Sequence, residues 1–171
     1  MHRDSMAVRN AIMANEKQFK LLTKYIATRG VDEYRQTVRV LVKPDDAVLE
    51  IGCEKGTTSD ILSRATKHLI ATDISDDCVA MARERYPHIR FEALDAFDIR
   101  SAMRLGAHFD KVYIDMSGLS SYRALLDVIA LITMYASVFE PDAIIVKSGS
   151  LKQFAKNCEA WKWHSQSAEP E

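Results

Sequence analysis

Residues 47–59 are Ala47-Val48-Leu49-Glu50-Ile51-Gly52-Cys53-Glu54-Lys55-Gly56-Thr57-Thr58-Ser59. The apolar run with β-branched members ends at Gly52, as is typical of a buried strand. A second glycine, Gly56, follows four positions later, and hydroxyl residues that can cap a helix come next. In α/β proteins a strand, a glycine loop and a helix N-terminus in this order bring bare backbone N–H groups up to a ligand.

The composition is that of an ordinary globular protein. The 171 residues are 47% hydrophobic and 27% charged with a net charge of −1, and this length fits one domain with a buried core. No apolar run approaches the length of a membrane span and the N-terminus is too polar for a signal peptide, so we expect no membrane partner. The three cysteines are widely spaced and odd in number, which favours reduced thiols in a cytoplasmic protein.

Charge is unevenly distributed along the chain. Residues 1–43 carry nine Lys or Arg against four Asp or Glu, a net +5, so the remainder carries −6. A basic helical face of this kind can steer an anionic substrate. We favour a solvated helix face here because the domain as a whole is not basic.

Helices and strands alternate after residue 44. Apolar residues at a helical period predict two N-terminal helices, over residues 5–28 and 32–42. Strands are predicted at 47–51, 68–72, 89–94, 111–114 and 143–147, with helices at 57–65, 76–85, 99–105, 121–139 and 151–160 and a further strand at 161–164. This alternation predicts a single doubly wound, mostly parallel α/β sheet over residues 45–171, with residues 1–44 as a cap on the substrate side.

Four predicted strands end in or beside an acidic residue: Glu50, Asp73, Asp95 and Asp115. Ligands of open parallel sheets bind at the carboxyl ends of the strands, so we expect these carboxylates on one rim. Asp73 stands 21 residues after Gly52, where a carboxylate can accept both hydroxyls of a ribose. Taken alone, each acid is equally a solvated strand end or a helix N-cap.

The segment Val48-Leu49-Glu50-Ile51-Gly52-Cys53 resembles the first motif of class I S-adenosylmethionine-dependent methyltransferases. The resemblance covers about residues 47–147 and implies strand order 3-2-1-4-5 and S-adenosylmethionine as the cofactor. It implies that Gly52 and Cys53 pass the methionine moiety, Asp73 and Ile74 hold the ribose, and Asp95 and Ala96 hold the adenine. Further expected cofactor contacts are Glu50, Gly56 and Asp115. Glu54 replaces the middle glycine of the common Gly-x-Gly-x-Gly form.

Residues after the fourth and fifth predicted strands bear on the acceptor. The chain lacks the Asn/Asp-Pro-Pro-Tyr/Phe motif of enzymes that methylate amino groups of adenine or glutamine, so an oxygen acceptor is expected. Asp115 and Tyr122 resemble the metal-dependent catechol type, where the aspartate binds Mg²⁺. That type has an Asp-Asn pair where Lys147-Ser148 stand and a lysine where Gly118 stands, so we expect no metal.

Asp115-Met116 and Val146-Lys147 resemble the small bacterial ribosomal-RNA ribose 2′-O-methyltransferases. The resemblance implies that Asp115 and Lys147 face each other across the pocket mouth as catalytic residues. A lysine there can orient a hydroxyl and, with its pKa lowered by burial, accept its proton. The alternative is an ion pair that contributes little.

Several questions stay open from the sequence. It does not decide whether the acceptor is an RNA or a small molecule, and it leaves the oligomeric state undetermined. Too little chain follows Lys147 for the usual closing strands, which are expected to be reduced or absent. The alternatives to a methyltransferase are a non-catalytic nucleotide-binding domain and a nicotinamide-dependent oxidoreductase, although the latter prefers Gly-x-Gly-x-x-Gly over the present glycine spacing.

Overall fold

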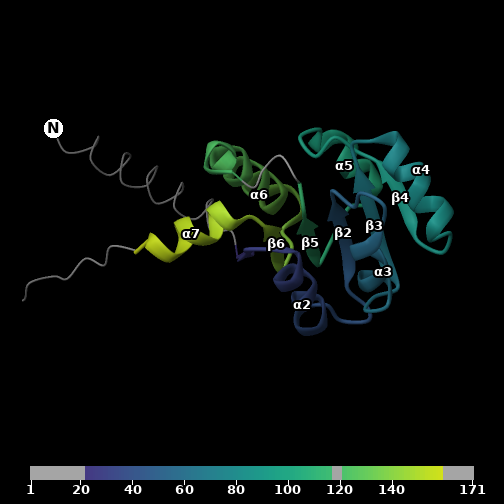
Figure 1. Ribbon diagram of the computed structural model, residues 1–171, viewed down its shortest axis with the longest axis horizontal. Coiled ribbons are helices and arrows are strands. Elements are labelled where there is room, and N and C mark those ends of the chain that lie inside the picture. Colours follow the sequence, from purple (N-terminus) through teal and green to yellow (C-terminus); the bar gives the residue numbers. More distant parts are fainter. Residues whose placement is uncertain (1–21, 117–120, 160–171) are drawn as a thin grey trace, which may run out of the picture.

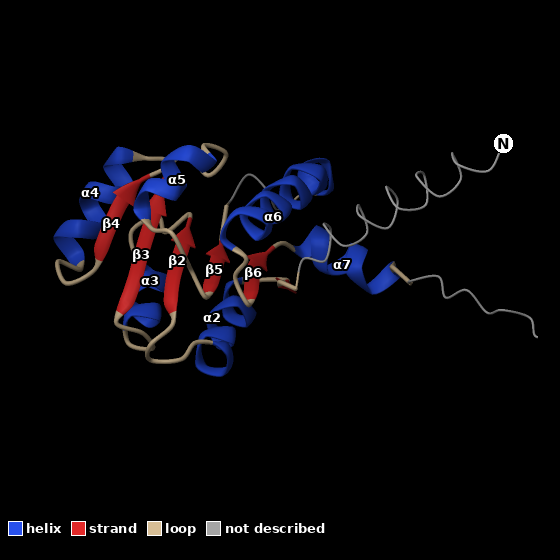
Figure 2. Ribbon diagram, turned by 180° about the vertical axis from the view of Figure 1, so that it is seen from behind, coloured by secondary structure: helices blue, strands red, loops and turns tan. Residues whose placement is uncertain are grey.

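The computed structural model describes residues 22–116 and 121–159, and these residues build one sheet of six parallel strands (Figures 1 and 2). The strand order is β1-β6-β5-β2-β3-β4. The strands are β1 (Lys24–Thr28), β2 (Ala47–Ile51), β3 (His68–Asp73), β4 (Arg90–Ala93), β5 (Lys111–Ile114) and β6 (Ala143–Lys147).

Helices cover both faces of the sheet (Figure 2). They are α2 (Val31–Leu41), α3 (Thr57–Ser63), α4 (Asp76–Arg85), α5 (Ile99–Leu105), α6 (Leu125–Phe139), preceded by the short 3₁₀ turn η2 (Tyr122–Ala124), and α7 (Gly149–Asn157). Successive residues of a strand point to opposite faces. On β2, Val48 packs with the buried residues of α2, α3 and α4, whereas Leu49 and Ile51 pack with those of α5, α6 and α7. The central strands are therefore mostly apolar, as is usual for parallel strands buried on both faces, with Glu50 of β2 and Lys111 of β5 as buried exceptions.

Five strands follow the predicted order. Numbered along the chain from β2, they run 3-2-1-4-5 across the sheet, and the doubly wound class I fold is confirmed. The bounds predicted for α4, α5, β5 and β6 agree with those of the structure.

The N-terminal side corrects the prediction. Residues 24–28, taken as the end of a helix over residues 5–28, form strand β1, which pairs with β6 from Lys24 opposite Ala143 to Thr28 opposite Lys147. Five residues fit a helical or a strand period about equally well, and the open edge of β6 decides between them. Residues 5–21 of the predicted helix lie outside the described residues.

The edge beside β6 is thus occupied from the N-terminal side of the chain. In the described residues after Lys147 there is a helix, α7, and no strand; the strand predicted at 161–164 lies outside them. Residues 24–41 share the sheet and one of its cores through Tyr34 and Val38 of α2. The role of residues 1–44 as a substrate cap stays a prediction.

One segment, Tyr122–Phe139, is long and apolar enough to cross a membrane by length and composition alone, contrary to the expectation that no such run exists. Its buried side chains recur every three or four residues: Val128, Leu131, Ile132, Tyr135, Ala136 and Phe139. They pack in the core formed with β5 and β6, as in the central helix of a globular domain.

Candidate functional site

A cavity of about 430 Å³ opens at the carboxyl ends of the strands. This is the size of a small-molecule site. The strand order reverses beside β2, whose neighbours are β3 and β5, and ligands of open α/β sheets bind at such a point. Six residues predicted from the sequence line the cavity: Gly52, Asp73, Ile74, Ala96, Asp115 and Lys147.

The loop after β2 touches the end of β5. Gly52 has φ +83°, and a Cβ built on it would lie 2.0 Å from the carbonyl oxygen of Asp115. The N–H groups of Gly52 and Cys53 both donate to the carbonyl oxygen of Thr72, at 2.8 and 2.9 Å. Only glycine permits the close approach of residue 52 to the Asp115 carbonyl, because any side chain would displace β5 or the loop.

The second glycine closes the same loop. Gly56 has φ +80°, and a Cβ there would lie 2.9 Å from the ring of Tyr86 and 3.0 Å from that of Phe91. Between the two glycines, Glu54 holds a left-handed φ of +49° with its side chain exposed. The loop is therefore held in one shape before α3 begins at Thr57.

Asp73, at the end of β3, orders this loop with its carboxylate. Its Oδ2 accepts from the Glu54 N–H at 2.9 Å, and its Oδ1 accepts from the Ser75 N–H at 3.0 Å. Each carboxylate oxygen has a further lone pair. Both oxygens can therefore still accept from a ligand, and Ile74 beside them is 70% exposed at the mouth of the cavity.

The loop after β4 supplies an apolar wall. Leu94 and Ala96 are buried and line the cavity, and the Ala96 carbonyl accepts from the Tyr135 hydroxyl of α6 at 3.0 Å. Asp95 between them is exposed, does not line the cavity, and accepts from the Phe97 N–H at 2.9 Å. Its contact with an adenine amine stays a prediction.

Asp115 and Lys147 form an ion pair across the mouth, Nζ against Oδ1. Asp115 directly follows β5, and Lys147 is the last residue of the neighbouring strand β6. The strand order therefore brings the two side chains together as predicted. Their side chains are 18% and 24% exposed, which leaves both accessible to a ligand in the cavity.

Besides Asp95, three further predicted contacts do not line the cavity: Glu50, Cys53 and Gly56. Glu50 is fully buried; its Oε2 accepts from the Ser59 hydroxyl at 2.5 Å, and within the described part of the chain its Oε1 has no partner. Burial raises the pKa of Glu50 to about 7, although the Ser59 hydrogen bond opposes the shift. Burial likewise raises the pKa of the Cys53 thiol. Their roles as cofactor contacts stay predictions.

Sequence reasoning missed several lining residues. Ile51 and Met116 adjoin predicted site residues, and Leu94 ends the predicted third strand. Their positions at or just after strand ends could have predicted that they line the cavity. Cys78 enters from the first turn of α4, where no motif marks it. Among the described residues no group of three His, Cys, Asp or Glu is placed to hold a metal ion.

A family model described as a methyltransferase domain matches residues 48–141, more than half of the chain. No curated protein matches the chain.

Solved structures share the fold. DesVI of Streptomyces venezuelae is 21% identical with a TM-score of 0.54, over 68% of this chain and 48% of that one. The sugar N-methyltransferase KedS8 of a Streptoalloteichus species is 16% identical with a TM-score of 0.53, over 68% and 46%. A TehB-like S-adenosylmethionine-dependent methyltransferase of Corynebacterium glutamicum is 14% identical with a TM-score of 0.53, over 91% and 79%. The chain thus spans about half the length of DesVI and KedS8.

Proposed function

Because the chain belongs to the family of methyltransferase domains and has their class I fold, with S-adenosylmethionine as the cofactor, we propose that it transfers the methyl group of this cofactor to an oxygen atom without a metal. The observation that carries the proposal is the cavity at the carboxyl ends of the strands, which Asp73, Asp115 and Lys147 all line. The cofactor supplies an electrophilic methyl group on a sulfonium.

The residues of the cavity fit this cofactor. Gly52 lines the cavity, and its close approach to β5 sets the position of the loop against which the methionine moiety would lie. The unused lone pairs of Asp73 suit the two ribose hydroxyls, and Leu94 with Ala96 forms an apolar wall for a planar base. Asp95, between Leu94 and Ala96, is the carboxylate proposed to accept from the exocyclic amine.

Asp115 and Lys147 act on the acceptor. The Asp115 carboxylate takes the proton of the acceptor hydroxyl, and the Lys147 ammonium holds that carboxylate and stabilises the negative charge that develops on the acceptor oxygen. The lysine supplies a positive charge beside Asp115, which supports transfer without a metal. The main task that remains is alignment of the oxygen with the methyl group.

A binding experiment separates this function from its rivals. In isothermal titration calorimetry we expect S-adenosylhomocysteine to bind and NAD to give no heat. The Asp73→Ala variant should bind about tenfold to a hundredfold more weakly, since hydrogen bonds to a charged group are lost. Binding of NAD instead would support an oxidoreductase. Cofactor binding with no transfer to any acceptor would support a non-catalytic nucleotide-binding domain.

A transfer assay tests Lys147. Using tritiated S-adenosylmethionine with RNA, small phenols and amino sugars as acceptors, we expect Lys147→Met to lower turnover by about a hundredfold or more while S-adenosylhomocysteine still binds. Lys152→Met is the matched control, because Lys152 pairs with Glu33 outside the cavity. Full turnover by Lys147→Met would make the pair structural. Amino sugars are included because KedS8 is a sugar N-methyltransferase, and labelling of nitrogen would contradict an oxygen acceptor.

We also propose a cytoplasmic location without a membrane partner. All three cysteines, Cys53, Cys78 and Cys158, are free thiols. Unpaired cysteines are usual in a reducing compartment. Fractionation of the cells that make the protein tests this proposal, and recovery in a membrane pellet after a salt wash contradicts it.

A further inference from the structure

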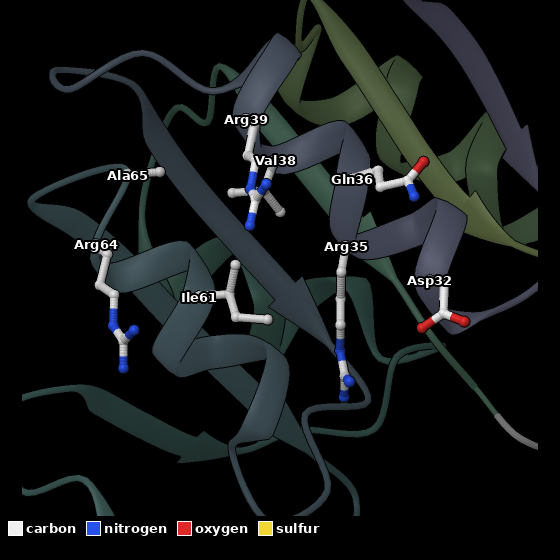
Figure 3. Close-up of a pocket in the computed structure, with 8 residues that line it drawn as sticks. All are labelled: Asp32, Arg35, Gln36, Val38, Arg39, Ile61, Arg64 and Ala65. Atoms are coloured by element: carbon white, nitrogen blue, oxygen red, sulfur yellow. The ribbon is translucent and has the colours of Figure 1, made fainter.

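A second hollow lies between α2 and α3, away from the cavity described above (Figure 3). It is an open groove of about 620 Å³, and no residue that lines it also lines the cavity. Arg35 and Arg39 reach it from α2, and Arg64 reaches it from the end of α3. We call this the arginine groove.

The end of the arginine groove at Arg35 adjoins the glycine loop. The Arg35 Nε donates to the Thr58 hydroxyl at 3.1 Å, and Thr58 is the second residue of α3, two positions after Gly56. Arg39 follows Arg35 by one helical turn, a rise of about 6 Å along α2. Arg64 directly follows the last residue of α3, at the opposite end of that helix from Thr58. The three arginines are therefore distributed along the length of the groove.

Positive charge exceeds negative charge in the groove. Asp32 is the acidic residue that lines it. Arg64 pairs with Asp60, but its side chain is 75% exposed, and an exposed pair of this kind is weak enough to exchange with another anion. Glu33 nearby is already bound by Lys152 and the Arg29 N–H. Within the described residues Arg39 has no carboxylate at ion-pair distance.

The floor of the groove is apolar. Ile61 and Ala65 are half-buried and give the floor its accessible apolar surface, whereas Val38 is 1% exposed and offers almost none. Planar guanidinium groups bind phosphates in a bidentate manner and also stack on bases, while apolar surfaces accept the faces of unstacked bases. We propose that the arginine groove binds a segment of single-stranded nucleic acid, with phosphates on the arginines and bases over the floor.

This binding goes beyond the proposed methyl transfer and does not depend on it. If the acceptor is an RNA, a strand in the groove passes beside the glycine loop toward the edge of the sheet that carries the cavity. If the acceptor is a small molecule, the groove still binds the strand. The two functions are therefore measured separately.

Fluorescence anisotropy with a labelled single-stranded RNA of about 20 nucleotides tests the proposal. Three phosphate contacts give a slope of about −2 for the logarithm of the affinity against the logarithm of the salt concentration. The double variant Arg39→Gln/Arg64→Gln should reduce the slope to about −0.7 and lower the affinity at least about tenfold at low salt. Arg35 is left in place because it bonds to Thr58.

The matched control is Arg100→Gln/Arg104→Gln, which removes the same charge from exposed arginines of α5 on the other face of the sheet. It should bind RNA like the unmodified chain. Equal losses in the two double variants, or no RNA binding by the unmodified chain, would overturn the proposal. So would competition by polyglutamate or by free uridine monophosphate as strong as that by RNA, since these indicate an acidic peptide or a free nucleotide. Unchanged S-adenosylhomocysteine binding by the groove variant shows that it is folded and that the cavity is intact.

Discussion

At the scale of single residues, the loop after β2 shows how this chain tolerates a side chain where relatives of its class have glycine. Glu54 adopts the left-handed conformation itself, with its side chain exposed and its N–H donated to Asp73. A non-glycine residue pays about 1 kcal/mol for this conformation, which one hydrogen bond to a carboxylate offsets. Gly52 differs because its missing Cβ is required by contact with β5.

Gly52→Ala should therefore be severely destabilising. The left-handed φ and a Cβ 2.0 Å from the Asp115 carbonyl oxygen both oppose alanine, and we expect a loss of about 3 kcal/mol or more in the free energy of unfolding in urea, with loss of S-adenosylhomocysteine binding. Gly149→Ala, whose Cβ meets nothing closer than 3.9 Å, should stay within about 1 kcal/mol of the unmodified chain. Equal stability of the two variants would contradict the close approach.

Glu50 makes stability depend on pH. Its pKa is about 7 in the folded chain against 4.5 for an exposed glutamate, so the folded state binds more protons between these values. The contribution of Glu50 is fully present below pH 4.5 and is lost as the pH rises through 7, by about 3 kcal/mol. Urea denaturation should show Glu50→Gln more stable than the unmodified chain at pH 8 and similar to it at pH 5.

The control for this measurement is Glu84→Gln on the exposed side of α4. It should change stability by less than about 0.5 kcal/mol at both pH values. A Glu50→Gln variant with the same pH dependence as the unmodified chain would mean that Glu50 is ionised in the folded state.

At the scale of secondary structure, β1 is the element that sequence periodicity assigned wrongly. Its hydrogen bonds to β6 include the Lys24 N–H to the Asp142 carbonyl, and the Thr28 carbonyl accepts from the Ser148 N–H. Alternate residues of a strand direct their backbone groups to opposite sides. Ile26 therefore shares the β6 side with Lys24 and Thr28, whereas Ala27 faces the other edge.

Proline substitutions distinguish a strand from a helix here. Ile26→Pro removes an N–H directed at β6 and should lower the free energy of unfolding by about 2–4 kcal/mol. Ala27→Pro removes an N–H on the other edge and should cost less than about 1 kcal/mol. Thermal melts of the two variants check this difference, and equally large losses would be expected only of a helix.

At the scale of the whole molecule, three features lie in separate places. The cavity opens at the carboxyl edge, and the arginine groove runs between α2 and α3. At the amino edge, Lys111 joins β5 to the turns before β2 and β6 through Asp46 at 3.3 Å and Asp142 at 2.9 Å. The hydrophobic core connects these three features. A ligand that binds the folded state and not the unfolded state therefore stabilises the whole domain.

Cofactor binding should accordingly raise the melting temperature. S-adenosylhomocysteine at about 100 times its dissociation constant contributes about 2.7 kcal/mol, which for a chain of this length is an increase of about 5–10 °C. Differential scanning fluorimetry measures it, with NAD at the same concentration as the control. No shift with S-adenosylhomocysteine, or a larger one with NAD, would contradict the proposed cofactor.

The sequence by itself determined the class of the fold, the order of five strands and six residues of the cavity. Apolar periodicity and turn residues are local, and the carboxyl ends of parallel strands share one edge, which predicted the fold class and the places of Asp73 and Asp115. The strand order and the roles of Ile74, Ala96 and Lys147 came from the resemblance to known methyltransferases. Only the tertiary structure decided that Lys24–Thr28 is a strand, that Glu50 is buried against Ser59, and that three arginines from α2 and α3 border one groove. Each depends on a partner distant in the sequence, which no local pattern records.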